Sequence, residues 1–366
     1  MKVLILSCGT GGGHNSAALA IKEELNNSNI EADFKEYLEI TNPHLKDRVN
    51  KLYIQTTKHN GKVFKKAYRL GELYQKTKLK SPVYQLNWLN RKKLYNYIIE
   101  NKYDYVVTTH LFPAQALTAI KKENNIHFIQ IATDYASIPF WDETNPDYFV
   151  IPNKELEGDF IQKGNKKESL KPIGIPVALR YSADYEKDKC REKLGLQKDK
   201  KYVLILTGSM GFGNISEMVE KLKNNIKDCI FIVSTGKNKE VLKQLKDTYI
   251  VPFTNDIDVY MKSSDVILSK PGGLTTTEIA TLRKPFIHTM PIPGCENYNA
   301  NFFAERKMSL KAENIEEVIE KTRLLINSQD LQEELKQNQA KYINKNATKE
   351  ICELIVKEAK RWINEK

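Results

Sequence analysis

The sequence lacks the apolar segments that carry proteins into or through membranes. None of its 366 residues lies in an uninterrupted apolar run of about 18 residues, the length that a membrane-spanning helix requires. The apolar run nearest the start, residues 3–6, is short, and a signal peptide needs a longer one. We therefore expect a cytoplasmic protein that does not span a membrane.

Cysteine is scarce and scattered. The chain has five cysteines, an odd number, and no C-x-x-C pair. This usage is typical of a reducing compartment and argues against a disulfide framework and a structural zinc site. No group of His, Cys and Asp residues has the spacing of metal ligands, so we expect no metal, and no G-x-S-x-G nucleophile motif is present.

Two glycine-rich turns fail the tests for common nucleotide motifs. In residues 7–15, SCGTGGGHN, the spacing G-x-G-x-x-G fits Gly9 and Gly11, but His14 occupies the third position, which disfavours an NAD site. Residues 208–213, GSMGFG, lack the Lys and Ser/Thr of a P-loop, which disfavours nucleotide hydrolysis. The second turn still allows an anion to approach the backbone.

Positive charge is concentrated in one segment. The whole chain carries +11, while residues 46–93 hold fourteen Lys and Arg against Asp47 and Glu72, a local charge of +12. Aromatic and aliphatic side chains are interspersed there, a mixture that suits an anionic membrane surface. Nucleic acid and a solvated helical face are the alternatives. Nothing in the segment resembles a base-reading module, so we expect no nucleic-acid partner.

Strand-like and helix-like segments alternate along the chain, which predicts an α/β fold of two Rossmann-like, doubly wound domains. Residues 171–181 contain two prolines and a glycine and are interpreted as a linker. The expected strands are residues 1–6, 30–37, 103–109, 127–132, 147–151, 202–206, 229–233, 249–252 and 266–268. We predict an N-terminal domain of residues 1–175, a C-terminal domain of residues 176–345, and a helix in residues 346–366 that packs back across the hinge.

The most informative stretch is residues 268–301. An apolar run ends there and is followed by Pro271, Gly272 and Gly273, a cluster of threonines, and Glu278. A strand, a glycine turn and a helix start bring several backbone N–H groups to the positive end of a helix dipole, which suits a phosphate. An ordinary strand-to-helix loop with a threonine cap is the alternative.

A second candidate site lies near the N-terminus. Gly11, Gly12 and Gly13 precede His14 at a helix start, so another molecule could approach the backbone beside an imidazole. Imidazole is suited to taking a proton from a hydroxyl, although His14 could equally bond a neighbouring loop at the helix N-terminus. Asp134 ends a buried strand and is a second base, a hydroxyl ligand or a helix cap.

Six motifs in this order resemble the metal-independent, two-domain nucleotide-sugar glycosyltransferases. They are more closely similar to the monogalactosyl- and glucosyl-diacylglycerol synthases, relatives of the enzyme that adds N-acetylglucosamine to lipid I. The motifs are GGGH at 11–14, TDY at 133–135 with Trp141, GIPV at 174–177, GSMGFG at 208–213, KPGGLT at 270–275 with Glu278, and PGCE at 293–296 with Asn299.

The resemblance implies two domains that face each other across a cleft, the GT-B type, with a UDP-sugar as co-substrate in the C-terminal domain. Glu278 would hold the ribose hydroxyls, and the chain at Phe253 and Thr254 would contact uracil. The other donor-side residues would face the diphosphate (Gly208, Ser209, Gly211, Gly272, Gly273, Leu274, Thr275, Thr276) or the sugar (Glu296, Asn299). His14 would be the catalytic base and Asp134 its orienter or substitute, with Gly11, Gly12, Gly13, Tyr135 and Trp141 on the acceptor side.

The function implied is inverting transfer of a hexose, from UDP-glucose or UDP-galactose, to diacylglycerol or its monoglycosyl product. Residues 46–93 would hold the protein on the anionic inner face of the cell membrane. The alternatives are transfer from UDP-N-acetylglucosamine to an isoprenoid lipid, a UDP-sugar epimerase, and a regulator that binds nucleotide sugar or lipid without catalysis. The sequence departs from the family at Gly9, where members have Asp, at Ile138, where many have His, and at Cys295, where Gln is common.

Overall fold

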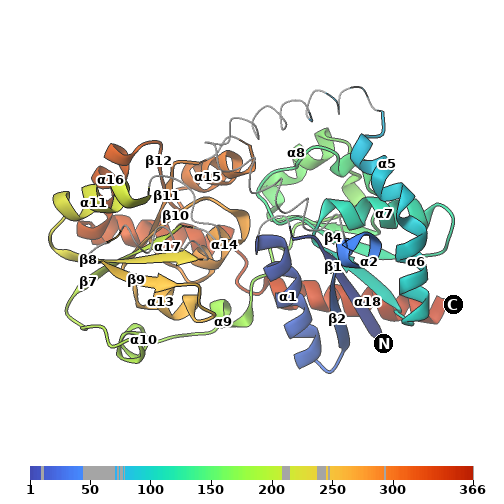
Figure 1. Ribbon diagram of the computed structural model, residues 1–366, viewed down its shortest axis with the longest axis horizontal. Helices are drawn as coiled ribbons and strands as arrows, with labels where there is room; N and C mark the ends of the chain where they lie inside the picture. Colours follow the sequence, from blue (N-terminus) through green and yellow to red (C-terminus); the bar gives the residue numbers. More distant parts are fainter. Residues whose placement is uncertain are drawn as a thin grey trace. The chain divides into compact units, whose positions relative to one another are not determined.

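The chain forms two compact units. The computed structural model describes residues 1–9, 12–43, 71, 74, 77, 79–207, 215–236, 245, 248–291 and 294–365 (Figure 1). The first unit comprises Met1–Leu179 and Asn346–Lys366, and the second comprises Arg180–Lys345. Most of residues 46–93 and the whole of turn 208–213 lie outside the described residues.

The first unit is built on a parallel six-stranded sheet with the order β2-β1-β3-β4-β5-β6. In its central pairing, Val3 of β1 lies opposite Tyr105 of β3. The strands are β1 (Lys2–Ser7), β2 (Glu31–Glu36), β3 (Tyr105–Thr108), β4 (Phe128–Ile131), β5 (Tyr148–Val150) and β6 (Leu170–Lys171).

Helices cover both faces of this sheet, which explains why β1 is apolar throughout. Val3 and Ile5 face one core with α1 and α18, whereas Leu4 and Leu6 face a second core with α6 and α7. The helices of this unit are α1 (Gly12–Asn27), α2 (Tyr37–Thr41), α5 (Pro82–Leu89), α6 (Arg91–Glu100), α7 (Leu111–Lys121), α8 (Glu157–Gln162) and α18 (Ala347–Glu365). A short helix, α9 (Leu179–Ser182), spans the boundary between the two units.

The second unit repeats this architecture. Its parallel sheet has the order β12-β11-β10-β7-β8-β9 and lies among helices (Figure 1). The strands are β7 (Lys201–Leu206), β8 (Cys229–Gly236), β9 (Tyr249–Pro252), β10 (Val266–Ser269), β11 (Phe286–Thr289) and β12 (Leu310–Ala312). The helices are α10 (Lys187–Lys193), α11 (Ile215–Asn225), α13 (Ile257–Ser263), α14 (Gly273–Thr281), α15 (Cys295–Glu305), α16 (Ile315–Asn327) and α17 (Gln329–Tyr342).

Each sheet has a point where the strand order reverses. In the first sheet it lies between β1 and β3, and in the second between β7 and β10. The predicted α/β class with two doubly wound sheets is confirmed. Ligands of such sheets gather at the carboxyl ends of the strands beside the reversal, and both candidate sites lie at such positions.

Several expected details differ from the structure. The predicted linker over residues 171–181 begins in β6 and ends in α9. The strand expected over 30–37 stops at Glu36, because Tyr37 begins α2. No threonine caps α14: Gly272 is its N-cap residue, without a side-chain cap, and the threonines lie inside the helix. Among the described residues, no helix combines the length and the apolar character that crossing a bilayer requires.

Candidate active site

The first candidate site is centred on His14, at the start of α1 and the carboxyl end of β1. Its Nδ1 lies 3.0 Å from the backbone oxygen of Thr109 and 2.8 Å from Oγ1 of Thr133. A carbonyl oxygen can only accept a hydrogen bond, so Nδ1 carries the proton and Nε2 keeps its lone pair. The Thr109 hydroxyl also donates to the His14 backbone oxygen at 3.0 Å. The ring is thereby fixed in the tautomer of a general base.

Burial keeps the His14 imidazole neutral. Burial lowers the pKa of His14 below its usual value, while the charge of Asp134 and the Thr109 carbonyl oppose that shift. A neutral ring at physiological pH can accept a proton. The structure therefore brings both predicted catalytic residues, His14 and Asp134, within electrostatic range of each other.

A second histidine, which the sequence analysis did not single out, lies beside the first. The rings of His14 and His110 meet edge to face with centroids 4.7 Å apart. The backbone N–H of Phe112 donates to His110 Nδ1 at 3.2 Å, so His110 caps α7 and carries its own proton on Nε2. Burial, together with the neighbouring His14, lowers the pKa of His110 well below its ordinary value. In the sequence, His110 directly follows the strand predicted over residues 103–109, and this position could have indicated a site residue.

The other predicted acceptor-side residues differ in their surroundings. Gly12 and Gly13 open α1, whereas Gly11 lies outside the described residues. Tyr135 is buried, and the ring of Trp141 packs between Phe149 and Phe160. Trp141 thus contributes to the core, and a role for it toward an acceptor stays a prediction. Gly9 stands where members of the family have Asp. Its N–H donates to a Glu36 carboxylate oxygen at 3.1 Å, so a carboxylate from β2 contacts this turn.

The second candidate site is a cavity of about 140 Å³ in the second unit. It lies at the carboxyl ends of β7, β8 and β9 and beside the start of α14. Four of the predicted donor-binding residues line it together. The lining consists of Leu206, Thr207, Ser234, Gly236, Phe253, Thr254, Ile257, Met261, Thr275 and Glu278. The predicted residues Gly208, Ser209 and Gly211 directly follow Thr207 but lie outside the described residues.

Glu278 is the titratable group of this cavity. Burial raises the pKa of its carboxyl to about 8, and the negative charge of Asp258 adds to the rise. The charge of Arg180 and a hydrogen bond with Tyr181 act in the opposite direction. The cavity therefore holds a carboxyl that is largely protonated at neutral pH and that ionises just above it.

The start of α14 supplies hydrogen-bond donors. The first N–H groups of a helix have no partner within it, and these belong to Gly273, Leu274 and Thr275. Open space surrounds Gly272, where an added Cβ would contact nothing within 4 Å. Thr276 was predicted to face the diphosphate, but its N–H bonds the Gly272 oxygen and its hydroxyl lies 3.1 Å from His288 Nε2. Thr276 therefore has a structural position inside the unit.

The predicted sugar-binding residues lie next to this turn. The Asn299 side chain is buried and donates from Nδ2 to the Pro271 backbone oxygen at 2.9 Å, which ties α15 to the turn. Glu296 stands in the first turn of α15. Burial lowers the pKa of Lys270, and the charge of Glu296 opposes that shift, so a half-buried ammonium also belongs to this site. The sequence analysis named Lys270 in a motif without assigning it a role.

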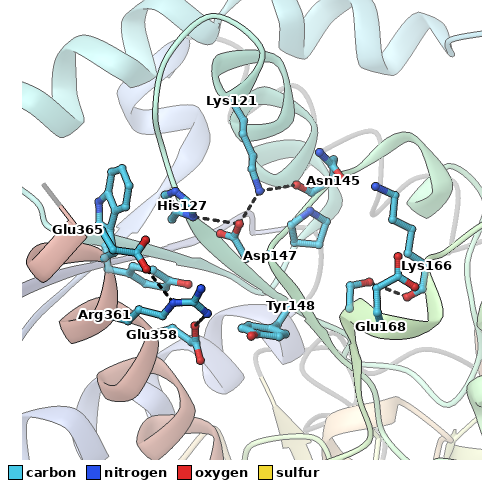
Figure 2. A pocket seen from close by; sticks show the side chains of 14 residues that line it. Lys121, His127, Asn145, Asp147, Tyr148, Lys166, Glu168, Glu358, Arg361 and Glu365 are labelled. Carbon is cyan, nitrogen blue, oxygen red and sulfur yellow. Dashed lines mark hydrogen bonds and ion pairs between the residues drawn. The ribbon is translucent and has the colours of Figure 1, made fainter.

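A larger cavity in the first unit contains none of the predicted residues. Its volume is about 490 Å³, and it lies at the amino ends of β3, β4 and β5, opposite the His14 edge of the sheet. Figure 2 shows that several of its charged groups pair with one another. Lys121 and His127 both contact Asp147, and Arg361 contacts Glu365. Among the described residues, no group of three His, Cys, Asp or Glu side chains could hold a metal ion.

Two family models match the chain, one for each half. The model described as monogalactosyldiacylglycerol (MGDG) synthase matches residues 14–177, and the model of the glycosyltransferase family 28 C-terminal domain matches residues 202–355. The first match includes His14 and Asp134, and the second includes the cavity around Glu278.

Similar proteins cover nearly the whole chain. A protein of Bacillus pumilus named processive diacylglycerol beta-glucosyltransferase is 27% identical and covers 100% of this chain and 97% of its own length. A protein of the same name from Staphylococcus saprophyticus is 26% identical, with 89% and 85% covered.

Solved structures share the fold. MurG from Acinetobacter baumannii has a TM-score of 0.62 at 16% identity, covering 97% of this chain and 99% of that one. UDP-GlcNAc 2-epimerase from Neisseria meningitidis, bound to UDP-GlcNAc, has a TM-score of 0.63 at 18% identity, covering 98% and 100%. At these identities the likeness concerns the fold alone.

Proposed function

The chain belongs to the glycosyltransferases that join a monogalactosyldiacylglycerol synthase domain to a family 28 C-terminal domain, and we propose that it transfers a hexose from a UDP-sugar to diacylglycerol. One structural observation carries the proposal for the donor. The cavity at the strand-order reversal of the second sheet is lined by Thr275, in the first turn of α14, and by the Glu278 carboxyl. A diphosphate needs several donors, and a ribose diol needs a bidentate acceptor.

We propose glucose as the transferred sugar. The relatives that match along the whole length are named glucosyltransferases, whereas the galactosyl name belongs to the model that matches the N-terminal half. The relatives' names also support diacylglycerol, or its monoglycosyl product, as the acceptor.

The proposed reaction is a single displacement with inversion. Nε2 of His14 takes the proton of the acceptor hydroxyl, and the hydroxyl oxygen forms the new bond to the anomeric carbon. The bond from that carbon to the UDP oxygen breaks, and UDP leaves with the electron pair. Asp134 offsets the positive charge that develops on the imidazole. The N–H groups of Gly273, Leu274 and Thr275, together with the Lys270 ammonium, offset the negative charge on the leaving diphosphate.

The described end of the basic segment supports attachment to a membrane. On α5, Tyr84 and Asn87 face the protein, and Asn87 donates to Gln115 at 2.8 Å. The helix also exposes large apolar side chains, whose exposed fractions are 55% for Leu86, 41% for Trp88 and 65% for Leu89. The Arg91 guanidinium lies 3.9 Å from the Trp88 ring.

An aromatic and aliphatic surface beside cations is the composition that enters an anionic lipid interface. We therefore propose that the chain is a peripheral protein of the inner face of the cell membrane. This surface would bring the His14 unit to its lipid acceptor.

A direct assay tests the function. The protein is incubated with vesicles that contain diacylglycerol and phosphatidylglycerol, with UDP-glucose, UDP-galactose or UDP-N-acetylglucosamine in separate reactions, and lipid products are identified by mass. We expect a hexosyl-diacylglycerol from UDP-glucose, together with UDP release.

Other outcomes would assign other functions. Product only from UDP-N-acetylglucosamine, or interconversion of UDP-sugars without a lipid product, would contradict the proposal. Binding of UDP-sugar without UDP release in any lipid mixture would indicate a regulator instead.

A further inference from the structure

A second cavity in the C-terminal unit carries an unbalanced positive charge. Its volume is about 580 Å³, and it lies at the amino ends of β10 and β11, the opposite end of the sheet from the donor cavity. Five cationic residues line it, against two acids. The cations are Lys187, Arg283, Lys284, Lys336 and Lys345.

Lys284 is the buried cation of this cavity, with only 6% of the residue exposed. Its ammonium donates to the backbone oxygens of Lys262, at 2.5 Å, and Ser264, at 2.9 Å. An ammonium has three N–H donors, so these two oxygens leave one, and the centre of the Tyr185 ring lies 5.1 Å from the ammonium. No carboxylate of the described residues lies within ion-pair distance of it. A buried cation without an anionic partner is costly, which makes this site unusual.

The two acids of the cavity are already engaged. Asp265 contacts Lys187 and also accepts from Arg191, at 2.8 Å, and from the Tyr202 backbone N–H, at 2.7 Å. Asp184 pairs with Lys345 at 2.8 Å. Lys336 contacts Glu333 at 3.6 Å, and that carboxylate does not line the cavity. Arg283, Lys284 and Lys336 therefore have no acidic partner within the lining.

The cavity of the first unit provides a comparison. It also lies at the amino ends of strands, but there Lys121 and His127 share the Asp147 carboxylate (Figure 2). That arrangement is balanced without a ligand. The positive charge of the second cavity is thus due to its own lining residues, because the cavity at the amino ends of β3, β4 and β5 lacks it.

We propose that this cavity binds a phosphate-bearing anion, with the Lys284 and Lys336 ammonium groups as its contacts. Its volume exceeds that of one phosphate group, and Tyr181, Tyr185 and Leu282 provide less polar wall for the rest of the ligand. An organic phosphate therefore fits better than a free ion. A soluble phosphate ester and a lipid headgroup share this chemistry.

The cavity is separate from the donor cavity but connected to it by one side chain. Tyr181 lines the cationic cavity and hydrogen-bonds Glu278 of the donor cavity. The two cavities have no lining residue in common, so binding of an anion in the cationic cavity can be measured while UDP occupies the donor cavity. The proposal rests on the charges of the cavity and does not depend on the transferase activity.

The experiment measures anion binding by the full chain with saturating UDP present to occupy the donor cavity. The probes are sn-glycerol 3-phosphate, followed by calorimetry, and vesicles of phosphatidylglycerol in phosphatidylcholine, followed by sedimentation. Lys336→Gln removes one contact from the surface helix α17. Lys341→Gln removes the same charge from the same helix outside the cavity and is the matched control.

We expect Lys336→Gln to weaken binding by about fivefold, and Lys284→Met by more than about tenfold, since hydrogen bonds to charged groups are among the stronger ones. Lys341→Gln should bind like the parent protein. Binding of the soluble ester assigns a metabolite site, and binding of vesicles alone, lost in Lys336→Gln, assigns a headgroup site. Equal losses in Lys336→Gln and Lys341→Gln, or no binding of either probe, would overturn the proposal.

Anion binding measured over a pH series tests whether the charged Lys284 ammonium contacts the anion or Lys284 has only a structural role. Burial and the neighbouring cations lower the pKa of Lys284 to about 7, and the groups that face it are Lys187, Lys336, Asp265, Cys190 and Tyr185. An anion that needs the charged ammonium should bind more weakly as pH rises from 6 to 8.5, and Lys284→Met should abolish that dependence. A parent protein with pH-independent binding would contradict contact with Lys284.

Discussion

The backbone oxygen of Thr109 lies 3.0 Å from Nδ1 of His14, although the two residues are 95 positions apart in the chain. This contact decides which nitrogen of the imidazole carries the proton. It also leaves Nε2 as the only ring atom that can accept one. The base proposed for the reaction is therefore oriented by a main-chain group that no side-chain substitution removes.

His14→Ala should reduce kcat by at least about 100-fold, because it removes the general base. UDP binding should stay near that of the parent protein, since the donor cavity lies in the other unit. Initial rates with diacylglycerol vesicles, together with calorimetry of UDP, check both parts. Unchanged turnover would remove His14 from the mechanism.

Asp134→Asn should shift the acidic side of the pH–activity profile. The charge of Asp134 raises the pKa of His14, so its removal allows burial to lower that pKa further. The neutral base then persists to lower pH, and the fall in kcat/KM should move to more acidic values. Profiles of the parent and the variant between pH 4.5 and 8 test this. An unmoved acidic side would contradict the electrostatic link.

Much of the fold and of the donor site could be predicted from the sequence because the evidence for it is local. An apolar strand, a glycine turn and helical spacing occur within 268–301, and this local pattern predicts a turn that suits a phosphate. The roles of Glu278, Gly272 and Thr275 came from the family resemblance. Residues 253 and 254 depended on the family resemblance, and they line the cavity with Glu278.

Long-range contacts could not be predicted in this way. The positions of Thr109, Thr133 and His110 around His14 depend on the order β1-β3-β4 in the sheet, which sequence spacing does not specify. The Asn299 amide is predicted to contact the sugar, which stays a prediction. Its bond to the Pro271 carbonyl is a contact that only the packing of α15 reveals. The charge environment of Lys284 likewise depends on packing, because its ammonium bonds backbone oxygens of Lys262 and Ser264, about 20 residues earlier in the chain.

Leu89→Glu should weaken binding to anionic vesicles. It removes an apolar side chain from the proposed interface, and a carboxylate there is repelled by the surface, so we expect at least about a tenfold weaker partition. Leu324→Glu changes a similarly exposed leucine on α16, an element of the second unit, and is the control. Vesicle sedimentation over a salt series measures the difference. Equal partition of the two variants would exclude α5 as the membrane surface.

The affinity for UDP should rise with pH. Glu278 has a pKa of about 8, and we expect the ribose hydroxyls to bind its ionised form as donors. Ionising the carboxyl costs free energy below that pKa, so the dissociation constant should fall about tenfold from pH 7 to pH 9. Calorimetry across this range measures the change, and Glu278→Gln should bind UDP about tenfold or more weakly without the pH dependence.

The same carboxyl should affect stability in the opposite direction. Its folded-state pKa lies above the ordinary value of 4.5, so the folded protein binds more protons between pH 4.5 and 8, and this group's contribution to the free energy of unfolding falls as pH rises through that window. Glu278→Gln should remove that part of the slope.

Tyr181→Phe supplies an independent check on the assignment. The Tyr181 hydroxyl lowers the pKa of Glu278, so its loss should move the rise in UDP affinity to higher pH without abolishing it. If the parent protein bound UDP equally at pH 7 and pH 9, the carboxyl would not be the ribose ligand.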